Sequence, residues 1–163
     1  MQCGNTSRIL SGLVCALLAF LIDQLSKFAV AEIIMQPRRE IYITEFLNIV
    51  LSYNKGISFG IMSDYFGSSP IVLSILTSMV VVGLSVWMLF SKTVMQAIAL
   101  GLTIGGASGN VYDRIHQGAV TDFIDLHLGT WHWPTFNTAD IAIVIGAAFL
   151  VASTLSDRQT PDK

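Results

Sequence analysis

The sequence has few charged residues and only two cysteines. Its 163 residues include 9 basic and 11 acidic ones, so charged residues make up 12% of the chain, about half the share of a typical soluble domain. A soluble domain of this size needs a polar surface over its core, and this composition cannot supply one. No basic tract is present, which argues against a nucleic-acid partner. Cys3 and Cys15 do not form a disulfide framework, and we assign neither a function.

Hydrophobic residues, in contrast, make up 53% of the chain. They fall into four stretches long enough to cross a bilayer at a rise of about 1.5 Å per residue. We predict an all-α membrane protein that forms one domain over residues 1–163, with helices at about 9–30, 70–90, 93–110 and 138–155. The first stretch also has features of a cleaved signal peptide, but Asp23, Gln24 and Lys27 interrupt the approach to the cleavage site.

The two long connections between these helices differ from the helices themselves. Residues 31–69 contain β-branched and aromatic runs and a turn at 54–56, and predict a small β element on the membrane surface, extending to 57–59. Residues 111–137 are crowded with polar side chains. An even number of spans places both connections on one side of the membrane and both termini on the other. The positive-inside rule does not orient the chain, because four basic residues lie on the terminal side and five on or near the other.

Small residues recur at every fourth position of the third predicted helix, at Ala97, Gly101, Gly105 and Gly109. This spacing forms a strip on one helix face and allows a neighbouring backbone to approach closely. Packing is sufficient to explain these glycines. Close packing at this end would also bring Asn110 and Asp113 near the polar residues of the fourth helix.

Polar groups at the edges of the predicted helices are functional candidates, because charge is costly there. Asp23 and Lys27 share a helix face and can neutralise each other. Asn137 and Asp140 have the spacing of a helix cap and the third helical residue, a structural explanation that suffices for these two alone. The predicted topology nevertheless gathers six groups at one membrane face: Asp23, Asn54, Asn110, Asp122, Asn137 and Asp140.

Two aspartates that meet at such a face can cleave a peptide bond. Like charges a few ångströms apart cannot both ionise, so the pair shares one proton. The ionised carboxylate takes a proton from water, while the protonated one stabilises the oxyanion. This is aspartic peptidase chemistry, which uses no metal and no cofactor.

Five sequence blocks resemble, in order and spacing, the motifs of the lipoprotein signal peptidase (signal peptidase II) family. They are Asp23–Lys27, Asn54–Gly60, Gly105–Arg114, Gly118–Phe123 and Phe136–Asp140. The resemblance implies an aspartic endopeptidase of the bacterial inner membrane that removes the signal peptide from diacylglyceryl-modified prolipoproteins, on the amino side of the lipidated cysteine. It also implies cytoplasmic termini, an active site at the periplasmic face under a β platform, contact with membrane lipids, and inhibition by globomycin-like cyclic peptides. We expect a monomer.

The resemblance also assigns roles to individual residues. The catalytic aspartates correspond to Asp122 and Asp140. The supporting residues, which we expect to bind substrate, correspond to Asp23, Lys27, Asn54, Asn110, Asp113, Arg114 and Asn137. The sequence departs from the family pattern at Ser58, Ser108 and Ile141, none of which carries a proposed role.

Two other functions are compatible with the residues alone. A metal-dependent hydrolase would draw its ligands from Asp113, His116, Asp122, Asp125, His127 and His132, although no HExxH motif occurs and the histidines lack a tight ligand spacing. A small proton-coupled carrier or channel subunit would use the carboxylates as proton relays, although the second and third helices carry no polar relay in their middles.

Overall fold

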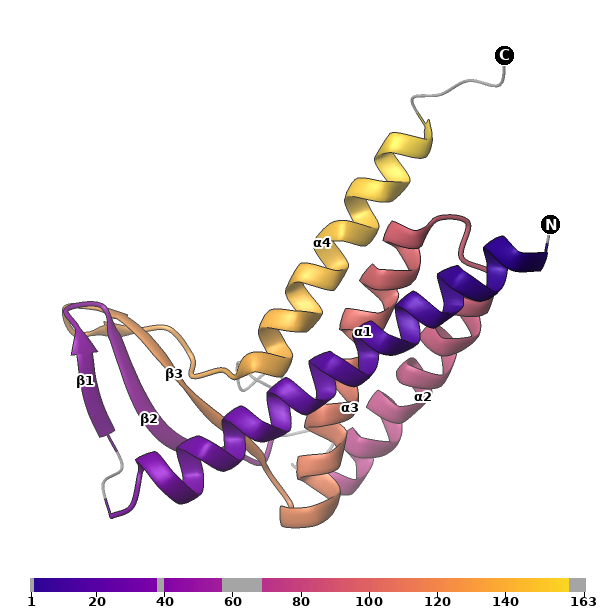
Figure 1. Cartoon of the computed structure of the whole chain (residues 1–163). Coiled ribbons are helices and arrows are strands. Elements are labelled where there is room, and N and C mark those ends of the chain that lie inside the picture. Colours follow the sequence, from indigo (N-terminus) through magenta and orange to yellow (C-terminus); the bar gives the residue numbers. More distant parts are fainter. Residues whose placement is uncertain (1, 38–39, 57–68, 159–163) are drawn as a thin grey trace.

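The computed structural model describes residues 2–37, 40–56 and 69–158. It is mostly helical, with a small antiparallel sheet beside one end of a helical bundle (Figure 1). The helices are α1 (Gln2–Phe28), α2 (Pro70–Leu89), α3 (Val94–Gln117) and α4 (Thr138–Arg158). In this described part of the chain, three stretches are long and apolar enough to cross a membrane: Asn5–Ile34, Pro70–Leu89 and Val94–Gln117. Within α4, Thr138–Ser153 forms a shorter apolar stretch.

Three helices extend beyond their predicted bounds, and of these α4 ends only three residues later, at Arg158. After Phe28, α1 continues as a π-helix over Ala29–Ile34. α3 does not end at 110 but continues to Gln117, where Gly118 adopts a φ of 74° and closes the helix. The apolar run ends before the helix does, because the last two turns of α3 carry polar side chains that are bonded inside the protein.

The sheet combines segments from both long connections. β1 (Glu40–Thr44) and β2 (Leu47–Asn54) come from the first connection, where a β element was predicted. β3 (Val120–Leu128) and β4 (Trp131–His132) come from the second connection and were not predicted. The strand order is β1-β2-β3-β4, with every neighbouring pair antiparallel. The predicted extension at 57–59 lies outside the described residues.

α3 lies against each of the other helices and is the centre of the bundle. Its strip of small residues faces α1. A side chain at Gly105 would overlap the backbone carbonyl oxygen of Ala16. The adjacent Gly106 instead faces the beginning of α4 at Ala139. These close approaches set the polar ends of three helices side by side.

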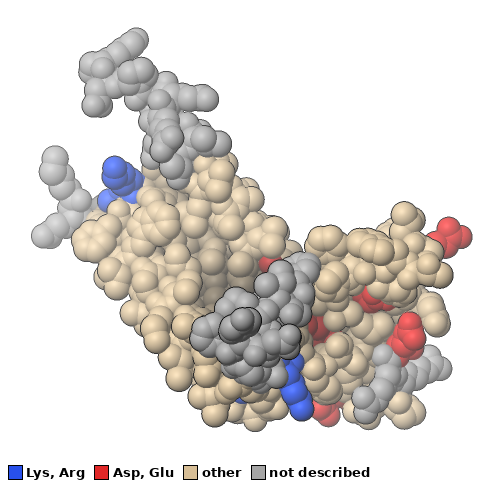
Figure 2. Space-filling view, turned by 180° about the vertical axis from the view of Figure 1, so that it is seen from behind, with Lys and Arg blue, Asp and Glu red and all other residues tan. Residues whose placement is uncertain are grey.

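α1 begins and α4 ends at the same end of the bundle, away from the sheet (Figure 1). The link between α2 and α3 also lies there, where the Arg8 side chain donates to the backbone carbonyl of Lys92. On the face that Figure 2 shows, the bundle carries few charged side chains, and acidic side chains gather at the sheet and at its junction with the helices. Large apolar side chains are widely exposed along the helices, which suits an integral membrane protein.

Candidate active site

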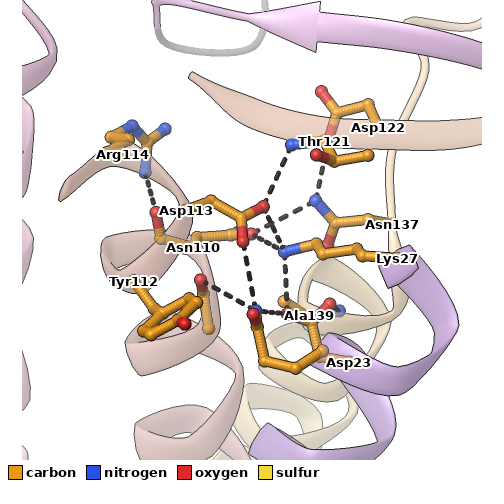
Figure 3. A network of polar contacts seen from close by, with 12 residues as sticks. Asp23, Lys27, Asn110, Tyr112, Asp113, Arg114, Thr121, Asp122, Asn137 and Ala139 are labelled. Atoms are coloured by element: carbon orange, nitrogen blue, oxygen red, sulfur yellow. Dashed lines mark hydrogen bonds and ion pairs between the residues drawn. The ribbon is translucent and has the colours of Figure 1, made fainter. Parts of the chain in front are cut away.

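One connected set of hydrogen bonds and ion pairs joins all nine predicted site residues where α1, α3 and α4 meet the sheet; Figure 3 labels all of them except Asn54 and Asp140. α1 supplies two of them, α3 three, and the sheet two, while the last two lie at the start of α4. They are Asp23, Lys27, Asn54, Asn110, Asp113, Arg114, Asp122, Asn137 and Asp140. The predicted gathering of polar groups at one end of the helices is therefore confirmed.

Asn137 links the two candidate catalytic aspartates. Its Nδ2 donates to Oδ1 of Asp122 at 2.7 Å, and its backbone N–H donates to Oδ2 of Asp140 at 3.2 Å. Its Oδ1 accepts from the backbone N–H of Asp140 at 3.0 Å. The reciprocal bonds between Asn137 and Asp140 form a capping box that begins α4. The helix-cap explanation is therefore correct, and the same asparagine also holds the second carboxylate.

The other carboxylate oxygens are held by amides from two further elements. Asn54 Nδ2 donates to Oδ2 of Asp122 at 3.1 Å, and Asn110 Nδ2 donates to Oδ1 of Asp140 at 3.0 Å. Both oxygens of each carboxyl group thus have a fixed partner, which orients the pair before any substrate binds. Asp122 is only 1% exposed, whereas Asp140 is partly exposed and is the member open to the surface.

A register shift in the sheet aims Asn54 at Asp122. In the antiparallel pairing of β2 with β3, Ile49 lies opposite Ile124, but Ser52 lies opposite Asp122. β2 therefore has one residue more than β3 between these two pairs. Side chains of a strand alternate between the two faces of the sheet. The extra residue therefore reverses the face from which each later side chain of β2 projects. Asn54 consequently projects from the same face as Asp122.

The surroundings of Asp122 raise its pKa to about 6. Burial is the largest cause, because it disfavours the charged form of the carboxyl group. The hydrogen bonds from Asn54 and Asn137 and the charge of Lys27 lower the pKa, while the charge of Asp140 raises it. The effect of Asp140 shows that the two carboxyl groups are close enough to influence each other's protonation.

Lys27 is the only cation in the interior of this network among the residues described. Its Nζ lies 2.7 Å from Oδ2 of Asp23 and 3.0 Å from Oδ2 of Asp113, and it donates to Oδ1 of Asn110 at 2.9 Å. Asp23, Lys27 and Asp113 are all buried. The Asp23–Lys27 pair was predicted from its spacing. The bridge to Asp113 was not, because it exists only when α1 and α3 lie together.

Asp23 has a second role that no spacing in the sequence indicated. Its Oδ1 accepts from the backbone N–H of Ala139 at 2.9 Å and from Oγ1 of Thr138 at 3.0 Å. These groups belong to the N-terminus of α4, where backbone N–H groups lack helical partners and negative charge is favoured. Asp23 therefore fixes the beginning of α4, and with it Asp140, relative to α1.

Two further residues join the network without having been predicted. Gln24 Nε2 donates to Oδ1 of Asp113, and the backbone N–H of Thr121 donates to Oδ2 of the same carboxylate, at 3.1 and 3.0 Å. Gln24 lies beside Asp23 in the first of the five motif blocks, and this position could have identified it as a site residue. Thr121 takes part through its backbone, which leaves no signal in the sequence.

Arg114 lies at the edge of the network. Its guanidinium donates to the backbone carbonyls of Asn110 and Gly56, each at 3.4 Å. Its Nε is buried and has no hydrogen-bond partner in the described part of the chain. Arg114 also lines an open groove beside α2, and its position there makes it a candidate to bind an acceptor on the substrate.

Of the histidines considered as metal ligands, His116 lies in α3 and stacks on Tyr112, while His127 and His132 lie farther along the sheet. Over residues 2–37, 40–56 and 69–158, no group of three or more His, Cys, Asp or Glu side chains could hold a metal ion. Asp125 accepts from Nδ2 of Asn48 at 3.2 Å and pairs with Nδ1 of His132 at 2.9 Å, and the His132 ring stacks on that of His127. These contacts join β2, β3 and β4 beyond Asp122.

Comparison with known proteins identifies the family. Residues 15–156 match the family model described as signal peptidase (SPase) II. The chain belongs to the signal peptidase II family. This membership confirms the predicted enzyme class, an aspartic peptidase.

Relatives of the signal peptidase II family cover most of the chain. The lipoprotein signal peptidase of Aeromonas hydrophila is 42% identical over 139 residues, which are 83% of each chain. That of Methylorubrum extorquens is 40% identical over 149 residues, which are 89% of this chain and 85% of the relative. A bacterial membrane enzyme solved by the in meso method at 2.3 Å resolution has a TM-score of 0.76 at 25% identity, over 93% of both chains.

Proposed function

We propose that this protein removes the signal peptide from diacylglyceryl-modified prolipoproteins by cutting on the amino side of the lipidated cysteine. The observation that carries this proposal is the pair of carboxyl groups, Asp122 and Asp140, joined through Asn137 at the end of apolar helices. The relatives named lipoprotein signal peptidase support the substrate class.

In the proposed reaction, Asp122 and Asp140 share one proton and act on a water molecule. The ionised carboxylate accepts a proton from the water as its oxygen attacks the scissile carbonyl, and the protonated carboxyl group donates to the developing oxyanion. When the carbonyl re-forms, the C–N bond breaks and the amino group of the cysteine leaves with a proton from the dyad. The raised pKa of Asp122, about 6, extends the range over which the dyad holds a proton to mildly acidic pH.

The other polar residues divide between substrate binding and support. We assign Arg114, which lines an open groove beside α2, to a backbone carbonyl of the substrate. Asn54, Asn110 and Asn137 hold the carboxylates in position. Asp23, Lys27 and Asp113 form the support beneath them, because their polar atoms are already bonded to one another, to α4 or to β3.

We also propose a four-span arrangement in the bacterial inner membrane. The three long apolar helices and the shorter apolar stretch of α4 support it. Both the start of α1 and the end of α4 lie opposite the sheet (Figure 1), which supports placing both termini on one side of the membrane and the dyad on the other. The family resemblance implies that the termini are cytoplasmic and that the dyad is at the periplasmic face. A substrate anchored by its lipid presents its scissile bond at that depth. The dyad is complete within one chain, which supports a monomer, and its cleft is the proposed site for globomycin-like inhibitors.

The test is cleavage of a purified diacylglyceryl-prolipoprotein in detergent or bilayers, with a chelator present. We expect cleavage by the wild type to persist with chelator and to fall at least about 1,000-fold in Asp122→Asn and Asp140→Asn, since each removes half of the proton relay. Asp125→Asn is the matched control: it alters a buried aspartate of the same strand, outside the dyad, and should retain activity within about tenfold. Thermal unfolding of each variant establishes that it is folded.

Three outcomes would contradict the proposal. Normal cleavage by Asp140→Asn would show that Asp140 serves only as a helix-cap residue. Loss of wild-type cleavage with chelator would favour a metal-dependent hydrolase. An inert wild type, together with proton flux in sealed vesicles, would favour the carrier or channel subunit.

A further inference from the structure

Two open grooves lead away from the dyad region along the helices. The first, here the α4 groove, has a volume of about 450 Å³ and is lined by Asp140, Ile141, Val144 and Ile145 of α4 and by the segment 133–136. The second, here the α2–α3 groove, has a volume of about 620 Å³ and is lined by α2 from Ile71 to Val82 and by Arg114 and Ile115 of α3.

We propose that the α4 groove binds the acyl chains of the substrate's diacylglyceryl group, and that the signal-peptide helix lies in the α2–α3 groove. This inference rests on the proposed function and adds to it which surface recognises the lipid. The lipid is attached to the sulfur of the residue directly after the scissile bond. Its acyl chains must therefore leave the dyad within a few bonds, and the α4 groove begins at Asp140 itself.

The lining of the α4 groove suits hydrocarbon. Apart from Asp140 and Thr135, every lining residue is apolar. From Asp140 to Ile145 the groove descends about 7.5 Å along α4, at about 1.5 Å per residue. Val144 is 67% exposed and Trp133 is 46% exposed, so the groove is open along its side. An acyl chain that is already in the bilayer can enter it laterally.

The shape of each groove indicates which part of the substrate it binds. The wall opposite α4 is an extended segment fixed to β3: the backbone of Phe136 pairs with Phe123 and Ile124, and that of Trp133 with Leu126. A single helix and an extended strand leave a narrow slot, which fits a flexible chain. The α2–α3 groove instead lies between two helices. Its α2 residues recur at helical spacing and include the small Ser74 and Ser78, which permit close approach of a third helix.

The experiment compares two substitutions of the same kind. Val144→Trp narrows the α4 groove and Val82→Trp narrows the α2–α3 groove; both valines are exposed helix residues, at 67% and 63%. Each variant and the wild type are assayed with substrates that carry dibutanoyl or dioctanoyl chains, because an octanoyl chain is long enough to pass Val144 and a butanoyl chain is not. In Val144→Trp we expect KM for the dioctanoyl substrate to rise about tenfold relative to the dibutanoyl one, the loss of about two buried methylene groups. In Val82→Trp both KM values should rise by the same factor.

A second measurement does not depend on turnover. A substrate with a photoreactive diazirine at the end of one acyl chain is bound to the uncleaving Asp122→Asn variant and irradiated. Crosslinks to residues 141–145 or 133–136 support the proposal, and crosslinks to α2 overturn it. Equal effects of Val144→Trp on both substrates, or a chain-length effect confined to Val82→Trp, would also overturn it. If the wild type cleaves neither substrate, it is the proposed function that fails.

Discussion

Single residues of this site serve the fold and the proposed chemistry at once. Asp140 is one half of the capping box that begins α4, and its partner Asn137 also binds Asp122. Asp23 caps the same helix from α1 while it pairs with Lys27. A substitution at any of these positions therefore changes stability as well as activity, and the two effects need to be measured separately.

The effect of Asp122 on stability can be measured separately from activity, through the pH dependence of unfolding. Its native pKa of about 6 lies above the value of about 3.9 for an exposed aspartate, so the folded protein binds this proton more tightly than the unfolded chain. The resulting stabilisation is fully present below about pH 4 and is lost as the pH rises through 6. Relative to Asp122→Asn, the free energy of unfolding of the wild type should fall by on the order of 3 kcal/mol between pH 4 and pH 7.5.

Unfolding of both proteins in the same detergent, at several pH values, measures this difference. The free energies of unfolding of the two proteins also differ by an amount that does not depend on pH, because asparagine changes the hydrogen bonds to Asn54 and Asn137 at every pH. Only the part of the difference that varies with pH tests the prediction. A difference that does not vary with pH would mean that Asp122 is not buried as an acid with a raised pKa.

Secondary-structure elements differ in how well the sequence predicts them. α2 was predicted almost to the residue, because Pro70 begins a hydrophobic run without charged residues that ends at the link to α3. The last turns of α3 and the whole of β3 were missed. Asp113, Asp122 and Asp125 in these segments are buried against parts of the chain far away in the sequence, so the usual apolar periodicity is absent. The site residues could be predicted from the sequence, because they are polar groups at the edges of membrane helices and lie in the motif blocks. The bonds between them could not be predicted, because those bonds depend on how the helices pack.

The contact between α1 and α3 provides a prediction at this scale. Gly105→Ala would place a Cβ against the Ala16 carbonyl and 2.8 Å from Cβ of Ala19, so the helices must separate. We expect destabilisation of about 1–3 kcal/mol and reduced activity, since α1 carries Asp23 and Lys27. Gly83→Ala in α2 is the control, because a Cβ there meets nothing within 4 Å. It should be neutral or stabilising by up to about 1 kcal/mol. Equal thermal stability of the two variants would show that the helices do not touch at Gly105.

At the scale of the whole molecule, the proposed function accounts for the position of the two aspartates. The helices place apolar surface on both sides of the site, and the sheet lies at the same end of the bundle as the site. Under the proposed function, the lipid and the signal peptide of the substrate remain in the bilayer while its scissile bond reaches the dyad at the surface. This holds only if the sheet and the α2–α3 link lie on opposite sides of the membrane.

Cysteine accessibility tests that arrangement. In a background with Cys3 and Cys15 replaced by alanine, Thr130→Cys marks the turn between β3 and β4, and Lys92→Cys marks the α2–α3 link; both positions are exposed. With a membrane-impermeant maleimide on intact bacterial spheroplasts, we expect labelling at 130 alone, and labelling at 92 only after permeabilisation. Retained cleavage activity shows that each variant is correctly folded. Labelling at 92 alone would invert the proposed orientation. Labelling at both positions without permeabilisation would mean that α3 does not cross the membrane, and the dyad would then lose its place at the periplasmic face.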